Sequence, residues 1–275
     1  MGQLLIDGID IEQFGVFVTE GGYKGLLSFP SLKEPKKKDW AERDGIEVDL
    51  SAPKLDTKNF SISFVVKTGG NLNGFTALIF NVGFHVFNFI DLGVTRNLRL
   101  VSSTDFKGSF DSMQLFSMEF ADDFPLSNYN YVSPASTKIS QRGYKLDLKD
   151  FSEYGVAILE GTDAEILKPC SIKPNLTVNV KYLSGVICDV GRVVLQHKEV
   201  KLNCLMLASN NLEFWRNYNS LLYDLTRVGL RYVTSNGIRY PCYYKSSSVS
   251  QYDGLGKIWC QFDLVLVFTK QGVSI

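Results

Sequence analysis

The chain carries two histidines, His85 and His197, at unrelated points of the sequence. Histidine serves as a general base or a metal ligand when acids, nucleophiles or further ligands accompany it. Neither residue belongs to an HExxH motif, a nucleophile elbow or a histidine-rich cluster. We therefore expect packing or solvated roles, with His85 inside a helix and His197 just before a strand. The sequence predicts no catalytic residue, no cofactor and no metal ion, and hence a protein that is not an enzyme.

The cysteines form the next candidate set. They are odd in number and widely spaced, and they lack the CxxC pairs that zinc sites use. Several stand at alternate positions of apolar strands, where a cysteine behaves as a small buried hydrophobic residue. Free thiols without disulfides are therefore predicted at Cys170, Cys188, Cys204, Cys242 and Cys260.

Two further motifs are explained by turns and loops. The DGLGK segment at residues 253–257 lacks the GxxxxGK[ST] spacing of a phosphate-binding loop and precedes a strand instead of a helix. The acidic pairs Asp122 with Asp123, and Glu42 with Asp44, stand in charged segments where solvation accounts for them. Neither motif predicts a reaction.

The densest charge run, KEPKKKDWAERDG at residues 33–45, holds nine charged side chains and one tryptophan. It is interpreted either as an exposed loop or as a docking arm whose charges steer a partner and whose Trp40 enters a pocket. The corresponding stretch at residues 168–185 lacks the charge run, so the two are expected to contact different surfaces. The candidate interface residues are Lys33, Lys36, Lys37, Lys38, Trp40 and Arg43.

The elements that would position this arm occur twice. When the sequence is compared with itself so that Phe14 stands on Tyr154, FGVFVTEG at residues 14–21 meets YGVAILEG at residues 154–161 without a gap. In the same alignment, the alternating apolar residues of 58–66 meet those of 198–206. This period of two predicts one strand with a buried face in each copy.

One amphipathic helix follows in each copy, because apolar residues recur there at three- and four-residue spacing. Asparagines that can act as N-caps precede both helices, namely Asn71 and Asn73 in one copy and Asn210 and Asn211 in the other. The apolar stripes are Phe75, Leu78, Ile79, Val82 and Val86 in the first copy and Phe214, Tyr218, Leu221, Leu225 and Val228 in the second.

The end of each copy is predicted to form strands. Asn236-Gly237 separates two strand-like segments and predicts a type I′ hairpin, and a closing strand ends each copy near residues 116 and 262. With one good helix per copy, the pattern favours a mainly β, largely antiparallel sandwich or barrel over a parallel α/β sheet. Two domains with one α-helix each are predicted at residues 1–125 and 144–275, joined by a polar linker at residues 126–143.

Composition agrees with two folded domains. The 275 residues are 45% hydrophobic, and 29 basic side chains balance 29 acidic ones. Residues 1–140 carry 13 basic and 17 acidic side chains, and residues 141–275 carry 16 and 12, so the two parts have net charges of −4 and +4. This difference is explained either by chance or by a head-to-tail arrangement in which first copies touch second copies. We expect no secretion signal, no membrane span and no sequence-specific binding of nucleic acid.

A family resemblance rests on the first copy. The opening IDGIDIEQFGVFVTEG at residues 6–21, followed by WAERDG at residues 40–45 and an alternating strand, resembles the N-terminal domain of distal tail proteins of long-tailed phages. The resemblance covers about residues 3–125, and the repeat extends a weaker form of it over residues 144–270. It implies a tail-tube-like fold that assembles as a ring between the tail tube and the tip or baseplate.

The duplication resembles baseplate hub proteins, in which three chains of two domains provide six pseudo-equivalent positions. It implies a homo-oligomer, either a trimer with pseudo-six-fold symmetry or a hexamer. The implied partners are the tail tube, the tape measure and tip or baseplate proteins, in the virion tail of a phage or prophage assembled in the host cytoplasm. The alternative is a tandem β-sandwich module that binds carbohydrate or protein, with Tyr243, Tyr244 and Tyr252 as exposed contacts.

Overall fold

The computed structural model describes residues 3–274 apart from 104–108, 111–112, 128, 175–176, 189–190 and 255–256. Most strands belong to two eight-stranded sheets, and two short hairpins form separate two-stranded sheets. Neighbouring strands pair antiparallel in both large sheets. The prediction of a mainly β, antiparallel fold with few helices is confirmed. Within the described residues, no helix is long and apolar enough to cross a membrane.

The N-terminal sheet has the order β2-β1-β7-β8-β10-β6-β3, and β9 pairs with β10. Its strands are β1 (Leu4–Ile6), β2 (Ile9–Asp10), β3 (Val16–Val18), β6 (Lys58–Val66), β7 (His85–Phe89), β8 (Val94–Ser103), β9 (Ser109–Phe110) and β10 (Met113–Asp122). The remaining elements of this half are the helices η1 (Ile11–Phe14), α1 (Lys24–Leu27) and α2 (Leu72–Ile79), and the hairpin of β4 (Lys37–Lys38) and β5 (Glu47–Val48).

The C-terminal sheet has the order β12-β11-β17-β18-β19-β16-β13, and β20 pairs with β18. Its strands are β11 (Lys145–Leu146), β12 (Lys149–Asp150), β13 (Val156–Ile158), β16 (Lys198–Ala208), β17 (Arg231–Ser235), β18 (Ile238–Asp253), β19 (Ile258–Phe268) and β20 (Val273–Ser274). The remaining elements are η2 (Phe151–Tyr154), α3 (Thr162–Leu167), α4 (Asn211–Leu225), and the hairpin of β14 (Thr177–Val178) and β15 (Ile187–Cys188).

The two halves correspond strand for strand, because the same succession of seven strands makes up each path. The correspondence reaches single contacts. Asp7 Oδ1 accepts a hydrogen bond from Val86 N at 2.8 Å, and Asp147 Oδ1 accepts one from Tyr232 N at 3.0 Å. The isolated bridges 32–55 and 172–195 also join equivalent positions of the two copies. The sequence repeat is thus a repeat of backbone structure.

Each half is held by the alternating strands that the sequence predicts. The inward residues of β6 and β16 are buried, and the polar residues between them face outward. Asn71 Oδ1 and Asn210 Oδ1 accept the N–H groups of Gly74 and Glu213 at 2.9 Å, so these two predicted N-caps are confirmed, whereas Asn73 and Asn211 lie inside the helices. The predicted hairpin is also confirmed, with Asn236 and Gly237 at φ 50° and 75° between β17 and β18.

The first helix is shorter than its apolar stripe suggests. It ends at Ile79, so Val82 lies outside it, and His85 and Val86 belong to strand β7 and not to a helix. Gly83, at φ 122°, stands in a conformation that a helix cannot contain. Likewise α4 ends at Leu225, before Val228. The sequence also gives no sign of α1 and α3, which are too short for a helical period to show.

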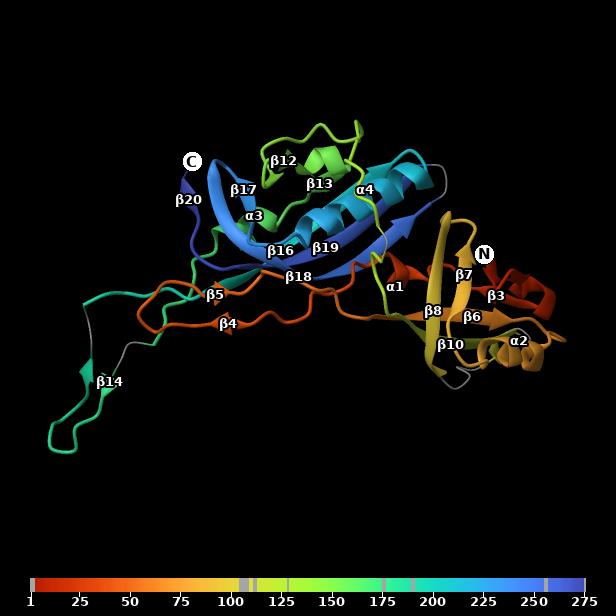
Figure 1. Cartoon of the computed structure of the whole chain (residues 1–275), viewed down its shortest axis with the longest axis horizontal. Helices are drawn as coiled ribbons and strands as arrows, with labels where there is room; N and C mark the ends of the chain where they lie inside the picture. The colour runs from red at the N-terminus through yellow and green to blue at the C-terminus, as the bar shows by residue number, and fades with distance from the viewer. Residues whose placement is uncertain are drawn as a thin grey trace.

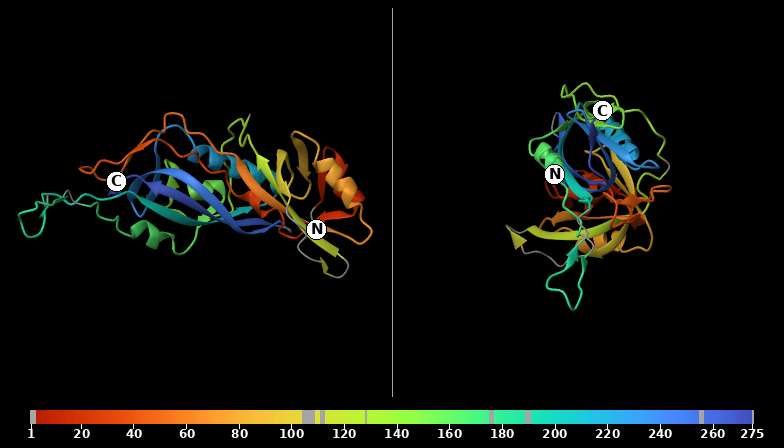
Figure 2. Two further views of the ribbon diagram at one scale, coloured as in Figure 1. Left: turned by 90° about the horizontal axis from the view of Figure 1, so that it is seen from below. Right: turned by 90° about the vertical axis from the view of Figure 1, so that its left-hand side faces the viewer.

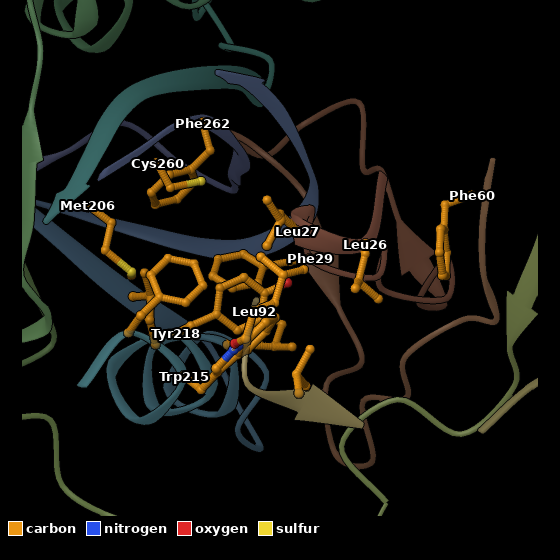
Figure 3. Packing of buried hydrophobic residues seen from close by; sticks show 14 of the residues in the cluster. Leu26, Leu27, Phe29, Phe60, Leu92, Met206, Trp215, Tyr218, Cys260 and Phe262 are labelled. Atoms are coloured by element: carbon orange, nitrogen blue, oxygen red, sulfur yellow. The ribbon is translucent and has the colours of Figure 1, made fainter. Parts of the chain in front are cut away.

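The two halves share one hydrophobic core. Leu27 and Phe29, at and just after the end of α1, point toward Tyr218 of α4 and Phe262 of β19 (Figure 3). Polar contacts support this packing, since the Tyr218 hydroxyl donates to Ser28 O at 2.8 Å and Trp215 Nε1 donates to Leu92 O at 2.6 Å. The halves therefore lie in fixed contact along the long axis of the molecule (Figure 1).

The segment predicted as an interdomain linker packs along helix α4. The Tyr131 hydroxyl donates to Asp224 Oδ2 at 3.0 Å, and Ala135 N donates to Asn217 Oδ1 at 3.1 Å, which fastens the segment along helix α4. Its tyrosines add to this packing, since the rings of Tyr131 and Tyr223 lie 5.0 Å apart between centroids.

Candidate assembly surface

The charged run predicted as a docking arm forms a hairpin that lies along the C-terminal half of the same chain (Figure 1). We call residues 37–48 the first hairpin and residues 177–188 the second hairpin. Lys37 and Lys38 form β4, and Trp40 and Arg43 lie in the turn that follows. Lys33 and Lys36 precede the hairpin. The surface that the first hairpin contacts is therefore partly intramolecular.

The turn of the first hairpin closes around a lysine of the other half. Lys173 Nζ donates to the backbone oxygens of Trp40 and Arg43 at 2.8 Å and of Gly45 at 2.7 Å, and it also binds the Asp39 carboxylate. The Lys173 side chain is buried. A buried ammonium is tolerated when acceptors replace its water, and the turn supplies them.

Backbone hydrogen bonds extend this contact. Gly45 N donates to Leu195 O at 2.8 Å, and Ile46 N donates to Thr269 O at 2.9 Å. Asp44 Oδ1 accepts from Leu195 N at 2.8 Å, and its Oδ2 lies 3.0 Å from Arg192 Nη2. The Leu195 N–H, and then Arg192, hold the pKa of Asp44 below its usual value. The hairpin is thus fixed by directional bonds as well as by charge.

Apolar burial completes the docking. Ile46 and Leu50 are buried against Tyr243 and Val267, with Leu230 packed at the edge of the cluster. Each of the two aliphatic side chains contributes about 1.5–3 kcal/mol when fully buried. Gly45 makes the close approach possible, since a Cβ there would stand 1.7 Å from Thr269 O and its φ is 70°.

Three of the predicted interface residues form one cluster on the turn. Lys38 Nζ and Arg43 Cζ lie 5.9 and 6.0 Å from the centroid of the Trp40 ring, and Trp40 Nε1 donates to Glu47 Oε2 at 3.1 Å. Trp40 remains 44% exposed, so it does not enter a pocket of this chain. Lys37 forms an ion pair with Glu34 at 2.6 Å, and Lys33 and Lys36 are exposed.

Sequence reasoning did not find Lys173, Leu195 and Thr269, which receive the first hairpin. The repeat held a signal for one of them, because the alignment that pairs Gly15 with Gly155 also places Lys173 on Lys33. The other two take part through backbone atoms, which any residue type supplies.

The second hairpin repeats the shape of the first but not its contacts. Leu183 N donates to Val180 O at 3.0 Å, as Arg43 N donates to Trp40 O at 3.2 Å. It projects from the end of the molecule away from the N-terminal sheet (Figures 1 and 2). Val186, the counterpart of buried Ile46, is 57% exposed. The first hairpin is therefore docked on the other half of its own chain, whereas Val186 of the second hairpin remains exposed.

The histidine His85 serves a structural role. Its Nδ1 lies 2.6 Å from Asp7 Oδ2 and its Nε2 lies 3.1 Å from Asn81 O, so both ring nitrogens are engaged. Arg231 binds Asp147 at 3.0 Å in the corresponding place of the other half, which identifies the contact as a clamp that the fold repeats. Among the described residues, no three or more His, Cys, Asp or Glu side chains are grouped to hold a metal ion.

The tyrosines considered as a carbohydrate-binding cluster are not exposed, so that expectation is wrong. Tyr243 and Tyr244 are buried, and Tyr252 packs partly buried against Phe214, with 6.0 Å between ring centroids. Tyr243 packs in the cluster that holds Ile46 and Leu50, so the segment of the first hairpin covers it. These three tyrosines therefore do not form an exposed surface for binding carbohydrate.

The remaining sequence candidates are structural. The five cysteines are free thiols, as predicted, and burial raises the pKa of Cys242 and Cys260 to about 12. Asp123 binds Arg99 at 2.8 Å, whereas Asp122 lies partly buried at the end of β10, where burial raises its pKa, so solvation does not account for this pair. Part of the 253–257 segment lies outside the described residues.

Lys58 predicts a pH dependence of stability. Its ammonium donates to Leu26 O at 2.5 Å and to Ser28 O, and burial, followed by the nearby Arg96, lowers its pKa to about 7. An unfolded lysine has a pKa near 10.4, so between about pH 7 and 10 the unfolded chain binds the extra proton. The free energy of unfolding should therefore rise with pH across that window, by up to about 1.4 kcal/mol per pH unit.

Urea unfolding of the full chain at pH 6, 7, 8 and 9 measures this slope. Lys58→Met should flatten it, whereas Lys145→Met, at an exposed position, should leave it unchanged. A Lys58→Met protein with the same pH slope as the wild type would show that Lys58 keeps its proton in the folded chain.

The chain has a remote likeness to a protein of known structure. No family model matches the chain, and no curated protein matches it. Among solved structures, the chain is similar to the SPP1 Dit (gp 19.1) protein, a paradigm of the hub adsorption apparatus in Gram-positive infecting phages. The likeness covers 97% of this chain and 98% of that chain, at 12% identity and a TM-score of 0.38.

Proposed function

We propose that the chain is a structural protein of a phage or phage-like tail, which forms a ring at the distal end and connects the tail tube to the tip or baseplate. Its partners would be further copies of itself, the tail tube, the tape measure and tip or baseplate proteins. Its place would be the virion tail, after assembly in the host cytoplasm. It would act without catalysis.

The observation that carries the proposal is the unequal state of the two arms. Gly45 and Ile46 of the first hairpin are buried on the C-terminal half, whereas Gly185 and Val186, their counterparts in the second hairpin, are exposed. When two equivalent units make a contact once within the chain and leave it open once, the same contact can add further chains. Such a head-to-tail series forms a ring when the rotation from unit to unit closes. The resemblance of residues 6–21 and 40–45 to distal tail proteins indicates which ring.

We place two domains at residues 1–125 and 144–275, with residues 126–143 between them. Each would provide one tail-tube-like position, so a trimer gives six positions and a hexamer gives twelve. The first hairpin crosses this boundary and lies on the second domain. The two domains of one chain would therefore behave as one rigid segment of the ring.

Light scattering coupled to gel filtration tests the proposal on the full chain. The expected mass is three or six times the 30.9 kDa of one chain, and negative-stain images should show rings with a central opening. A monomer that persists at tens of micromolar would contradict a ring made by this protein.

A further inference from the structure

We infer that the second hairpin docks on the N-terminal half of a neighbouring chain of the same protein, and that its turn closes around Lys33 of that neighbouring chain. This inference rests on the proposed ring and specifies its contact. The docking of the first hairpin on the C-terminal half is the template, because the two halves correspond element for element.

The second hairpin has the same backbone pairing as the docked first hairpin. Its strands pair Thr177 with Cys188 and Val178 with Ile187, as β4 pairs with β5 at the equivalent positions of the first copy. Gly185 holds a positive φ of 93°, as Gly45 holds 70°, yet a Cβ on Gly185 would meet nothing within 4 Å. The second hairpin therefore has the positive φ of the docked turn, with open space beside Gly185.

Equivalent apolar side chains are buried in the first repeat and exposed in the second. Leu27 of the first copy is 1% exposed because it packs on the C-terminal half, and its counterpart Leu167 is 61% exposed. Ile46 and Val186 differ in the same way, at 4% and 57%. These side chains of the second copy thus lack the cover that a neighbouring N-terminal half would provide.

The N-terminal sheet offers the matching receiver. Strand pairing places Phe84 where the other half has Leu230, and Phe124 where it has Lys270. Both phenylalanines are exposed, and their rings lie 5.9 Å apart. In the C-terminal half this position receives Ile46. Phe84 and Phe124 of one chain would accordingly receive Val186 of the neighbouring chain.

The lysine that the first hairpin encloses, Lys173, also has a counterpart in the N-terminal half. Lys33 is the equivalent of Lys173 in the first copy, and its backbone N–H makes the same bond, to Lys54 O at 2.8 Å as Lys173 N does to Val194 O. Lys33 lacks the cover that the turn of the first hairpin gives to the buried Lys173. The carbonyls of Val180, Leu183 and Gly185 correspond to the three that bind Lys173. Net charges of −4 and +4 on the two parts also favour this head-to-tail order.

Two single variants and their mixture test the inference by gel filtration with light scattering. Val186→Asp disables the donor, and Lys33→Glu disables the receiver. Each should raise the dissociation constant of the assembly at least tenfold, with thermal unfolding of the monomer unchanged. Mixed in equal amounts, they retain one good donor and one good receiver, so a complex of two chains should form and grow no further. Leu148→Asp and Lys145→Glu, both at exposed positions, are the matched controls and should assemble like the wild type.

The outcomes separate the inference from the proposed function. Wild-type rings that both variants also form would overturn the hairpin contact and leave the ring proposal intact. A wild-type chain that stays monomeric at tens of micromolar would overturn both. Monomeric variants that do not pair on mixing would show that the two substitutions act outside one shared contact, which also overturns the inference.

Discussion

Gly45→Ala is expected to lower the free energy of unfolding of the full chain by about 3–6 kcal/mol, the contribution of two buried aliphatic side chains at about 1.5–3 kcal/mol each. The added Cβ would stand 1.7 Å from the backbone oxygen of Thr269, which cannot move without breaking the end of β19. The first hairpin must therefore leave its site, and the burial of Ile46 and Leu50 is lost with it. Urea unfolding measures the loss, and trypsin should cut faster in the lysine-rich first hairpin.

Gly185→Ala is the matched control, because it alters the same position of the same turn in the second hairpin. Its Cβ meets nothing within 4 Å, so the expected cost is only that of a left-handed alanine, about 1–2 kcal/mol. Equal effects of the two substitutions would show that backbone strain, and not docking of the first hairpin, makes Gly45 necessary.

The sequence predicted the fold where a single segment determines its own structure. The alternating apolar residues of β6 and β16, the N-caps Asn71 and Asn210 and the Asn236-Gly237 turn each act over a few residues, and each prediction is confirmed. Alignment of the chain with itself further predicted a repeat without any knowledge of contacts. The first helix was predicted to extend through Val82 and Val86 because both continue its apolar spacing, although Val86 belongs to strand β7.

The candidate surface was predicted only in part, for a physical reason. Charge density located the first hairpin and the cluster of Lys38, Trp40 and Arg43. The surface that receives it comes from Lys173 and from backbone atoms in the other half of the chain, and no local pattern encodes such a pairing. Tyr243 looked exposed for the same reason, since the residues that cover it are distant in sequence.

Lys173→Met should destabilise the full chain by about 1–3 kcal/mol, the cost of leaving a buried acceptor without its donor. Methionine keeps the volume of the stem but leaves the oxygens of Trp40, Arg43 and Gly45 without their donor. Urea unfolding at a concentration where the chain is dissociated measures the change.

Lys33→Met provides the comparison, because it makes the same substitution at the equivalent position of the N-terminal half. Lys33 is exposed in the single chain, so its replacement should change the stability of the dissociated chain by less than about 0.5 kcal/mol. If the second hairpin closes around Lys33 of a neighbouring chain, the same substitution should weaken assembly. One lysine would then act within the chain and its counterpart between chains, and equal losses of stability from both would contradict that division.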